Sequence, residues 1–189
     1  RQIATAFVQI ALDAGMPVEF QIGEPWWWVQ PQGRKPCFYD SAAQAILPDA
    51  APITDMRQPM DEDQLALLDA AGALLAQSTA ALAQAVRDAT VNGGGGEAEI
   101  LLLAFTPTVL DPEMPELKRV NLPVGWAHPA FDRLQLEDYD WLTDGATAAR
   151  RAGYALVQAR LDLGEQDTAR FSRRICGENL RKIITEVLR

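Results

Sequence analysis

The segment Gly23-Glu24-Pro25-Trp26-Trp27-Trp28 carries residue types that could bind and cleave a sugar. The apolar C–H faces of sugar rings stack on indole, while sugar hydroxyls are bound by carboxylates and amides. Tryptophan that excludes water also raises a carboxyl pKa, which suits Glu24 to general acid catalysis. Side chains alternate along an extended segment, so the three tryptophans cannot all point inward. Packing of these rings in a core beneath a loop is the alternative.

A second acidic and aromatic cluster, Glu137-Asp138-Tyr139-Asp140-Trp141, follows an alternating segment. Two carboxylates from two strand ends can act on one glycosidic bond, one as acid and the other as nucleophile or base. We predict Glu24 and Glu137 in these two roles. The predicted substrate-binding residues are Trp26, Trp27, Trp28, Trp126, His128, Asp138, Tyr139, Asp140 and Trp141. The alternatives are a solvated acidic turn that caps the next helix through Asp144, and a structural or merely exposed loop histidine.

Composition excludes several classes of function. The 189 residues include 17 Lys+Arg and 26 Asp+Glu, a net charge of −9. Such an acidic chain is poorly suited to nucleic acid or to anionic lipid. Cys37 and Cys176 form no CxxC pair and His128 is the single histidine, so we predict neither a metal nor a cofactor. The glycine run 93–96 lacks the Lys-Ser/Thr of a phosphate-binding loop, and no apolar run looks long enough to cross a membrane.

Apolar spacing predicts the secondary structure. Helices are expected over 3–14, 42–47, 62–89 and 143–161, and strands over 18–22, 99–105 and 131–136. The helix 62–89 has the strongest pattern. Its apolar residues Leu68, Ala71, Leu75, Leu82 and Val86 recur at helical spacing. Asp61 and Gln64 can form a capping box before it, and Asp40 can cap the helix at 42–47.

The same patterns predict which faces are buried. Phe7, Ile10 and Ala11 would form the apolar side of the first helix. In the helix 143–161 the predicted apolar stripe is Ala148, Ala152, Ala155, Leu156 and Ala159. The continuous apolar run 99–105 is typical of a strand buried on both faces. The proline-rich segment 106–129 is predicted to be one long loop.

Alternating helices and strands predict an α/β fold with parallel strands. A complete eight-stranded barrel needs about 250 residues, so either a small open sheet or part of a (β/α) TIM-like barrel is expected. We assign residues 1–169 to this partial barrel and 170–189 to a basic C-terminal tail. The tail holds six basic and two acidic residues, and its apolar spacing predicts an amphipathic helix. It is either a simple terminal helix or a docking element for a partner.

Several segments together resemble one family. They are Gly23-Glu24-Pro25-Trp26-Trp27-Trp28, Leu122-Pro123-Val124-Gly125-Trp126-Ala127, His128-Pro129-Ala130-Phe131-Asp132 and Leu134-Gln135-Leu136-Glu137-Asp138-Tyr139-Asp140-Trp141. Over residues 11–161 the chain is similar to the TIM-barrel-like, glycoside-hydrolase-like domain of baseplate proteins in gene transfer agents and related tailed phages. The resemblance implies a component of a tail particle that acts on, or binds, cell-envelope polysaccharide. Glu24 would be its acid/base residue and Glu137 the candidate second carboxylate.

Two departures from this family favour a non-catalytic alternative. Gly23 stands where the wider clan of barrel hydrolases has an asparagine that positions the sugar. In that clan two strands lie between the strands that carry the two catalytic glutamates. Here one clear strand lies between the strand before Glu24 and the strand that ends at Glu137. A carbohydrate-binding or structural tail domain is therefore the second hypothesis. The third is a small α/β module for protein–protein contact.

The predicted partners follow from these hypotheses. They are a polysaccharide or cell-envelope glycan and other tail or baseplate subunits. A homo-oligomer is also possible, because an incomplete barrel exposes strand edges that can pair with another chain. The separation between the carboxyl groups of Glu24 and Glu137 would discriminate a hydrolase from a binding domain.

Overall fold

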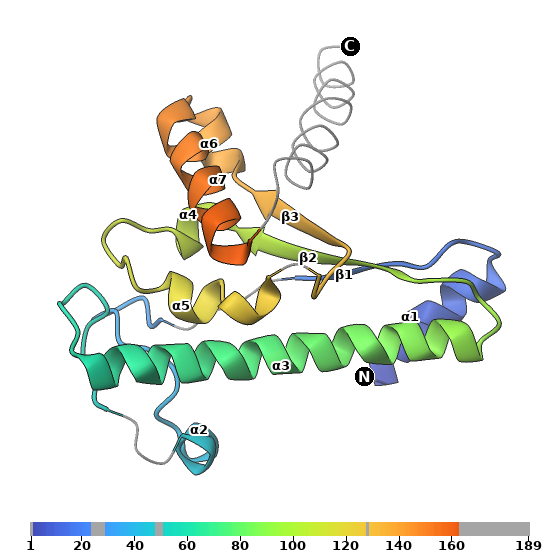
Figure 1. The fold of residues 1–189 in the computed structure, drawn as a ribbon, viewed down its shortest axis with the longest axis horizontal. Helices are drawn as coiled ribbons and strands as arrows, with labels where there is room; N and C mark the ends of the chain where they lie inside the picture. Colours follow the sequence, from blue (N-terminus) through green and yellow to red (C-terminus); the bar gives the residue numbers. More distant parts are fainter. Residues whose placement is uncertain (1, 24–28, 48–50, 128, 163–189) are drawn as a thin grey trace.

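A computed structural model describes residues 2–23, 29–47, 51–127 and 129–162. Within these ranges the strands β1 (Glu19–Ile22), β2 (Glu99–Phe105) and β3 (Arg133–Glu137) form one parallel sheet. The strand order is β1-β2-β3, so strands that follow one another in the sequence are neighbours in the sheet (Figure 1). Helices lie between successive strands, which confirms the predicted α/β class with parallel strands.

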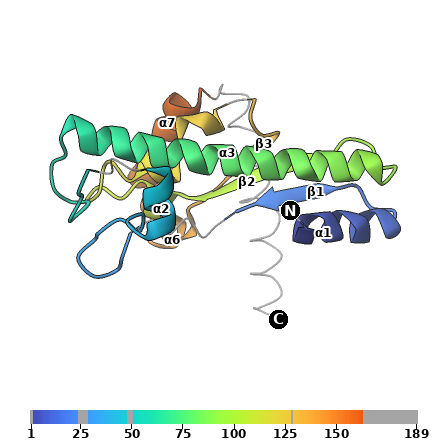
Figure 2. The ribbon, with the colours of Figure 1, turned by 90° about the horizontal axis from the view of Figure 1, so that it is seen from below.

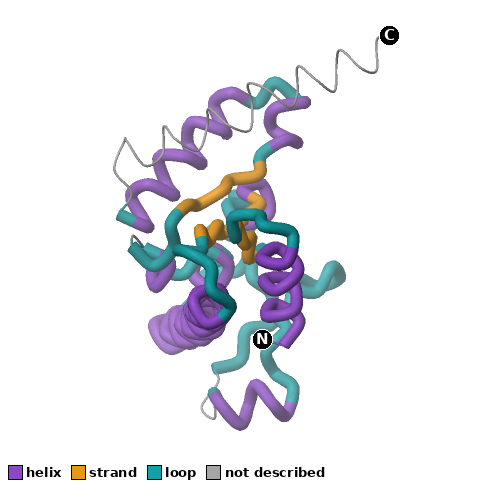
Figure 3. Tube along the Cα trace, turned by 90° about the vertical axis from the view of Figure 1, so that its right-hand side faces the viewer, coloured by secondary structure: helices purple, strands orange, loops and turns teal. Residues whose placement is uncertain are grey.

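The described helices differ greatly in length. They are α1 (Gln2–Asp13), α2 (Ser41–Ile46), α3 (Glu62–Asn92), α4 (Thr106–Val109), α5 (Lys118–Asn121), the 3-10 helix η1 (Val124–Trp126), α6 (Tyr139–Thr143) and α7 (Thr147–Leu161). The long helix α3 runs along the whole sheet, and α1 lies beside β1 and α3 (Figures 1 and 2). Seen nearly along α3, the strands pass through the middle of the molecule (Figure 3).

The main core lies on one face of the sheet. Ile100, Leu102 and Ala104 of β2 are buried and pack with residues of α1, α3, η1, β3 and α7. Leu101 and Leu103 on the opposite face stay partly exposed. The prediction that the strand is buried on both faces is therefore wrong. Sequential parallel strands with right-handed crossovers place their connecting helices on the same face, so these helices leave the other face uncovered.

In two helices, α1 and α7, the side that packs against the core differs from the one that the spacing of apolar residues predicted. In α1 the buried residues are Ala4 and Val8, whereas Phe7 and Ile10 are 60% and 64% exposed. In α7 Gly153, Val157 and Leu161 are buried. The alanines predicted to face the core there, Ala148, Ala152, Ala155 and Ala159, are exposed. Alanine is favoured anywhere in a helix, so its spacing says little about which side is buried.

Both predicted helix caps are confirmed. The Asp61 carboxylate accepts a hydrogen bond from the backbone N–H of Gln64, and the Gln64 side chain accepts one from the backbone N–H of Asp61. At α2 the Asp40 carboxylate accepts hydrogen bonds from the backbone N–H groups of Ala42 and Ala43. These capping hydrogen bonds join residues only two or three positions apart, so the sequence alone was sufficient to predict them.

By length and composition α3 is apolar enough to cross a membrane, with a mean hydropathy of 1.5 over 18 residues. The prediction that no segment reaches that length is wrong, because the many alanines of α3 were not counted as an apolar run. Ten of its 31 residues are buried against the sheet and other helices. A core helix of a folded domain satisfies the same criterion, so the finding is weak evidence for a membrane span.

The proline-rich segment 106–129 does not form the single loop that was predicted. It contains α4, α5 and η1, and it contributes Met114, Leu117 and Val120 to a second buried cluster. Phe38, Ile53 and Met56 complete that cluster together with the first turns of α3. The apolar residues between the prolines bury enough surface to order the segment, which polar loops cannot do.

Candidate functional site

The carboxyl ends of the three strands form a stepped edge. Ile22, the last residue of β1, is level with Leu102 and Leu134 in the sheet register. Strand β3 continues to Glu137, three residues further, which is about 10 Å at the usual rise of a strand. Open α/β sheets bind ligands outside the carboxyl ends of their strands, so this edge is a candidate ligand site.

Gly23 lies directly after β1 and packs closely on β2. A Cβ atom placed on Gly23 would lie 3.1 Å from both Cβ and Cδ2 of Leu103. An asparagine here, as in the clan of barrel hydrolases, would press against that leucine. The next predicted residues, Glu24 and Trp26 to Trp28, lie outside the described residues, as does His128.

Glu137 lies at the end of β3 beside two aromatic rings. The Tyr139 hydroxyl donates to Glu137 Oε2 at 3.2 Å, and the Thr106 hydroxyl donates to the Glu137 backbone oxygen at 2.9 Å. The Tyr139 ring lies 5.3 Å from that of Phe105, and Tyr139 is 53% exposed. An exposed ring can stack on the apolar face of a sugar, and a carboxylate beside it can accept hydrogen bonds from the sugar hydroxyls.

Asp138 has a different role from the predicted binding of substrate. It is 7% exposed, and its Oδ2 atom accepts hydrogen bonds from Arg150 Nε at 2.5 Å and from the Tyr154 hydroxyl at 3.2 Å. Burial and the nearby Asp138 charge raise the pKa of Tyr154. These contacts join the end of β3 to α7. Arg150 and Tyr154 are four residues apart on one side of α7, a signal that the sequence contained.

Asp140 and Trp141 lie on the short helix α6. Asp140 is exposed, while Trp141 is partly buried against α7, where a Cβ atom on Gly153 would lie 2.8 Å from its Cζ3 atom. Asp144 is the C-terminal cap of α6 and the N-terminal cap of α7 is Ala146, so the alternative in which Asp144 caps the next helix is not found.

Trp126 is a core residue. It is 3% exposed, its indole N–H donates to the Thr79 hydroxyl of α3 at 2.8 Å, and its ring packs edge-on against Phe131 at 6.5 Å. A side chain this deeply buried offers no face on which a sugar could stack. The prediction that Trp126 lines the binding cleft is therefore corrected: the residue anchors η1 to α3.

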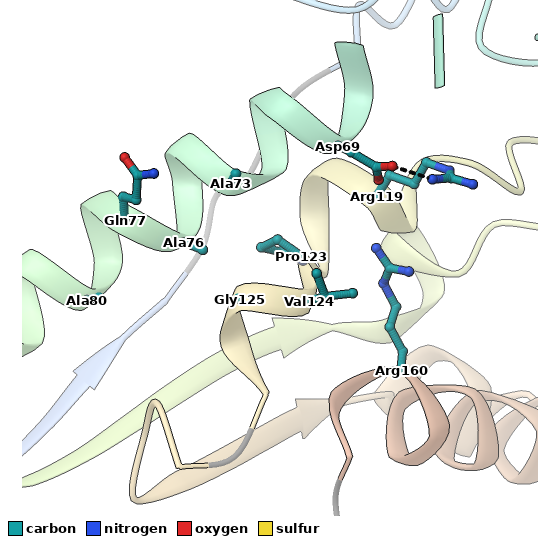
Figure 4. Close-up of a pocket in the computed structure, with 10 residues that line it drawn as sticks. All are labelled: Asp69, Ala73, Ala76, Gln77, Ala80, Arg119, Pro123, Val124, Gly125 and Arg160. Carbon is teal, nitrogen blue, oxygen red and sulfur yellow. Dashed lines mark hydrogen bonds and ion pairs between the residues drawn. The ribbon is translucent and has the colours of Figure 1, made fainter. Parts of the chain in front are cut away.

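A pocket of about 600 Å³ lies in the helix layer, between α3, η1 and α7 (Figure 4). Its α3 wall consists of small residues, Ala73, Ala76 and Ala80. On the opposite side, a Cβ atom on Gly125 would lie 2.7 Å from the Ala76 side chain, so glycine allows η1 to approach α3 closely. No sequence pattern indicates this pocket, because its shape depends on how segments distant in the sequence pack together.

Arg160 places a guanidinium at the pocket. Its Nε donates to the Leu122 backbone oxygen at 2.6 Å, and within the described part of the chain its two terminal nitrogens have no hydrogen-bond partner. Burial lowers the pKa of Arg160. Its guanidinium points toward Arg119, which is paired with Asp69 and Glu116 at 2.6 Å each (Figure 4).

A family model described as "Non-contractile tail sheath protein TIM barrel" matches residues 1–178. The chain belongs to this family. The resemblance to a TIM-barrel-like domain of a phage-type tail protein is thus confirmed. The protein is a tail sheath protein, however, and not the baseplate protein that the resemblance implied. No curated protein sequence matches the chain. No solved structure matches it either.

The tail sheath domain extends beyond the residues that the structure describes. The family match runs through the predicted boundary at 169/170, so the division into a barrel and a basic tail stays a prediction, and residues 163–189 lie outside the described residues. Among the residues that the structure describes, no group of three or more His, Cys, Asp or Glu side chains could hold a metal ion.

Proposed function

We propose that this chain is a non-catalytic, structural domain of the tail sheath that binds an acidic segment of a neighbouring tail subunit. The observation that carries the proposal is the pocket in the helix layer with the Arg160 guanidinium, whose two terminal nitrogens have no hydrogen-bond partner among the described residues. A tail sheath implies other tail subunits as partners. Such partners require a recognition surface, and this pocket combines an apolar wall with one directed charge.

The chemistry of the pocket selects a carboxylate. The two terminal nitrogens of Arg160 can donate a parallel pair of hydrogen bonds to one carboxylate, which is the strongest ordinary pairing of arginine. The small side chains of α3 leave room for the aliphatic part of an aspartate or glutamate. Subunits with the composition of this chain, at a net charge of −9, supply such acidic groups in excess.

The contacts at the carboxyl edge support the non-catalytic part of the proposal. Asp138 is committed to Arg150 and Tyr154, and Trp126 is buried, so two of the residues expected to bind a sugar support the fold instead. Glu137 accepts a hydrogen bond from Tyr139.

The test compares two arginines of α7 in the whole sheath protein. Arg160→Gln removes the guanidinium at the pocket, and Arg151→Gln removes an exposed arginine of the same helix. We expect R160Q to lower incorporation into assembled sheath at least about tenfold, while its melting temperature stays close to that of R151Q. Ala73→Leu, which adds volume at the pocket, should weaken assembly in the same way. Assembly of R160Q and A73L at the wild-type level would refute the proposal.

Glycan binding at the carboxyl edge is a second candidate function. It is favoured by the exposed Tyr139 ring beside Glu137. Tyr139→Ala and Glu137→Gln should each weaken the binding of cell-envelope polysaccharide, whereas Asp144→Asn should not. Release of reducing ends by the wild-type chain, lost in Glu24→Gln, would instead support the paired-carboxylate hydrolase. Binding without release of product is the outcome we expect if this candidate is correct.

A further inference from the structure

Three charged side chains lie together at one end of the pocket in the helix layer. They are Asp69 of α3, Arg119 of α5 and Arg160 of α7 (Figure 4). The other described residues of the lining are uncharged. Two guanidiniums and one carboxylate leave the lining with a net charge of +1. The charge that a ligand meets in this pocket is therefore set by one side chain from each of three helices.

Arg119 lies between two carboxylates that differ in their position. Its Nη1 atom donates to Asp69 Oδ2 at 2.6 Å, and its Nε atom donates to Glu116 Oε2 at 2.6 Å. Glu116 lies outside the lining, and the Lys118 ammonium lies 4.0 Å from its Oε1 atom, so these two charges largely offset each other at the pocket. Asp69 lines the pocket itself, and its side chain is 54% exposed. Asp69 is thus the carboxylate that a ligand meets directly.

The charge of Asp69 also acts on Arg160. The Arg160 guanidinium points toward Arg119, to which the Asp69 carboxylate is bound (Figure 4). Burial lowers the pKa of Arg160, and the neighbouring charge of Asp69 acts in the opposite direction. An anion that binds to Arg160 is therefore repelled by Asp69 at the same time. Asp69 reduces the attraction that the two guanidiniums would otherwise exert together.

We propose that Asp69 determines the charge specificity of this pocket, so that it accepts one singly charged carboxylate and disfavours a doubly charged phosphoryl group. This inference rests on the proposed function, because it concerns the ligand of the same pocket. A single carboxylate matches the lining charge of +1, whereas a dianion leaves one negative charge without a partner beside Asp69. In Asp69→Asn the lining charge rises to +2, which matches a phosphoryl group. The ligand of the wild-type pocket is thus an aspartate or glutamate side chain and not a phosphorylated residue.

Titration of the 189-residue chain with short peptides, followed by nuclear magnetic resonance, tests this specificity. The probes are acetylated and amidated alanine pentapeptides that carry glutamate, glutamine or phosphoserine at the centre. The wild type should bind the glutamate peptide more tightly than the other two. At about 0.1 M salt, Asp69→Asn should tighten binding of the glutamate peptide about threefold and of the phosphoserine peptide about tenfold, because the electrostatic free energy doubles with the ligand charge. Binding of the glutamine peptide should not change.

The matched control is Asp88→Asn, which removes an equal charge from the same helix. Asp88 is exposed and lies 19 residues further along α3, about 28 Å away at the rise of an α-helix. This distance is more than twice the screening length of about 10 Å at 0.1 M salt. All three peptides should therefore bind to Asp88→Asn as they bind to the wild type.

A purely structural role of Asp69 predicts changes of the opposite sign. Loss of its bond to Arg119 would then distort the pocket, and every peptide would bind more weakly. Unchanged or weaker binding of the two charged peptides to D69N overturns the inference, as do equal gains for both. Arg160→Gln separates this result from the proposed function. If R160Q binds the glutamate peptide as the wild type does, the proposed function fails; if R160Q loses binding and D69N gains none, only the present inference fails.

Discussion

The carboxyl edge of the sheet and the pocket in the helix layer each hold a charged side chain, and the two differ in whether that charge has an ion-pair partner among the described residues. At the edge, the Asp138 carboxylate is buried and has its cation, Arg150, within the same domain. In the pocket, the Arg160 guanidinium is half-buried and binds only a backbone oxygen among the described residues. The edge where α/β folds bind ligands is here partly a packed junction, whereas the helix layer holds a guanidinium that has no ion-pair partner among the described residues. Stability is therefore expected to depend on the first region, and partner binding on the second.

The largest expected effect concerns Asp138. Asp138→Asn leaves the Arg150 guanidinium without its counter-ion in a region that is mostly buried, and breaking such a pair costs about 3 kcal/mol. For a domain of this size we expect the melting temperature to fall by about 5–10 °C in a calorimetric scan. Asp140→Asn, two residues away and exposed, should change it little. If Asp138→Asn instead kept full stability, the carboxyl edge would not be a structural junction and the contrast with the pocket would fail.

An intermediate effect is expected at Trp126, which fixes the η1 wall of the pocket. Trp126→Phe retains a ring but removes the indole N–H that donates to the Thr79 hydroxyl. Loss of one buried hydrogen bond, together with the smaller ring, should cost about 1–2 kcal/mol in urea unfolding. We expect sheath assembly to weaken as well, because η1 contributes Val124 and Gly125 to the pocket.

The matched control for that variant is Trp141→Phe. Trp141 packs against α7 at the carboxyl edge, and no side-chain hydrogen bond of its indole is found in the described part of the chain. It should lose less stability and leave assembly unchanged. Equal effects of the two variants on assembly would mean that the pocket has no special relation to the partner.

The smallest expected effect is a pH dependence at the edge of the pocket. The hydrogen bond from Arg119 lowers the pKa of Glu116 below its usual value of 4.5. A carboxyl group with a lowered pKa stabilises the fold above its unfolded pKa, and this contribution is lost as the pH falls through the lowered value. Both side chains are partly exposed, so we expect a few tenths of a kcal/mol at most.

Unfolding in urea between pH 6 and pH 3 measures this dependence. Glu116→Gln should be slightly less stable than wild type at pH 6, and the difference should vanish toward pH 3. A difference that grows as the pH falls has the wrong sign for this ion pair. The Arg160 guanidinium stays protonated over the whole range, so its contribution should not change with pH.

Features that depend on short stretches of sequence were predicted well. The parallel α/β class, the long helix α3 and the caps at Asp40 and Asp61 follow from local spacing and from hydrogen bonds between near neighbours. The roles of Glu24 and of the tryptophans after it remain predictions. Trp126 was misread because nothing in its sequence neighbourhood distinguishes a ring that lines a cleft from one that anchors a loop to a helix.

What the sequence by itself determined is where the longer helices and the three strands form, since a residue's backbone preference and its neighbours up to four positions away decide that. Only the tertiary structure decided which sides are buried. Phe7 and Ile10 face outward because α3 and β1 cover the neighbouring side of α1, and one face of β2 is only partly buried because the described helices lie on the other. The Asp138–Arg150 pair and the Arg160 pocket likewise join elements distant in the sequence, so they exist only once the chain is packed.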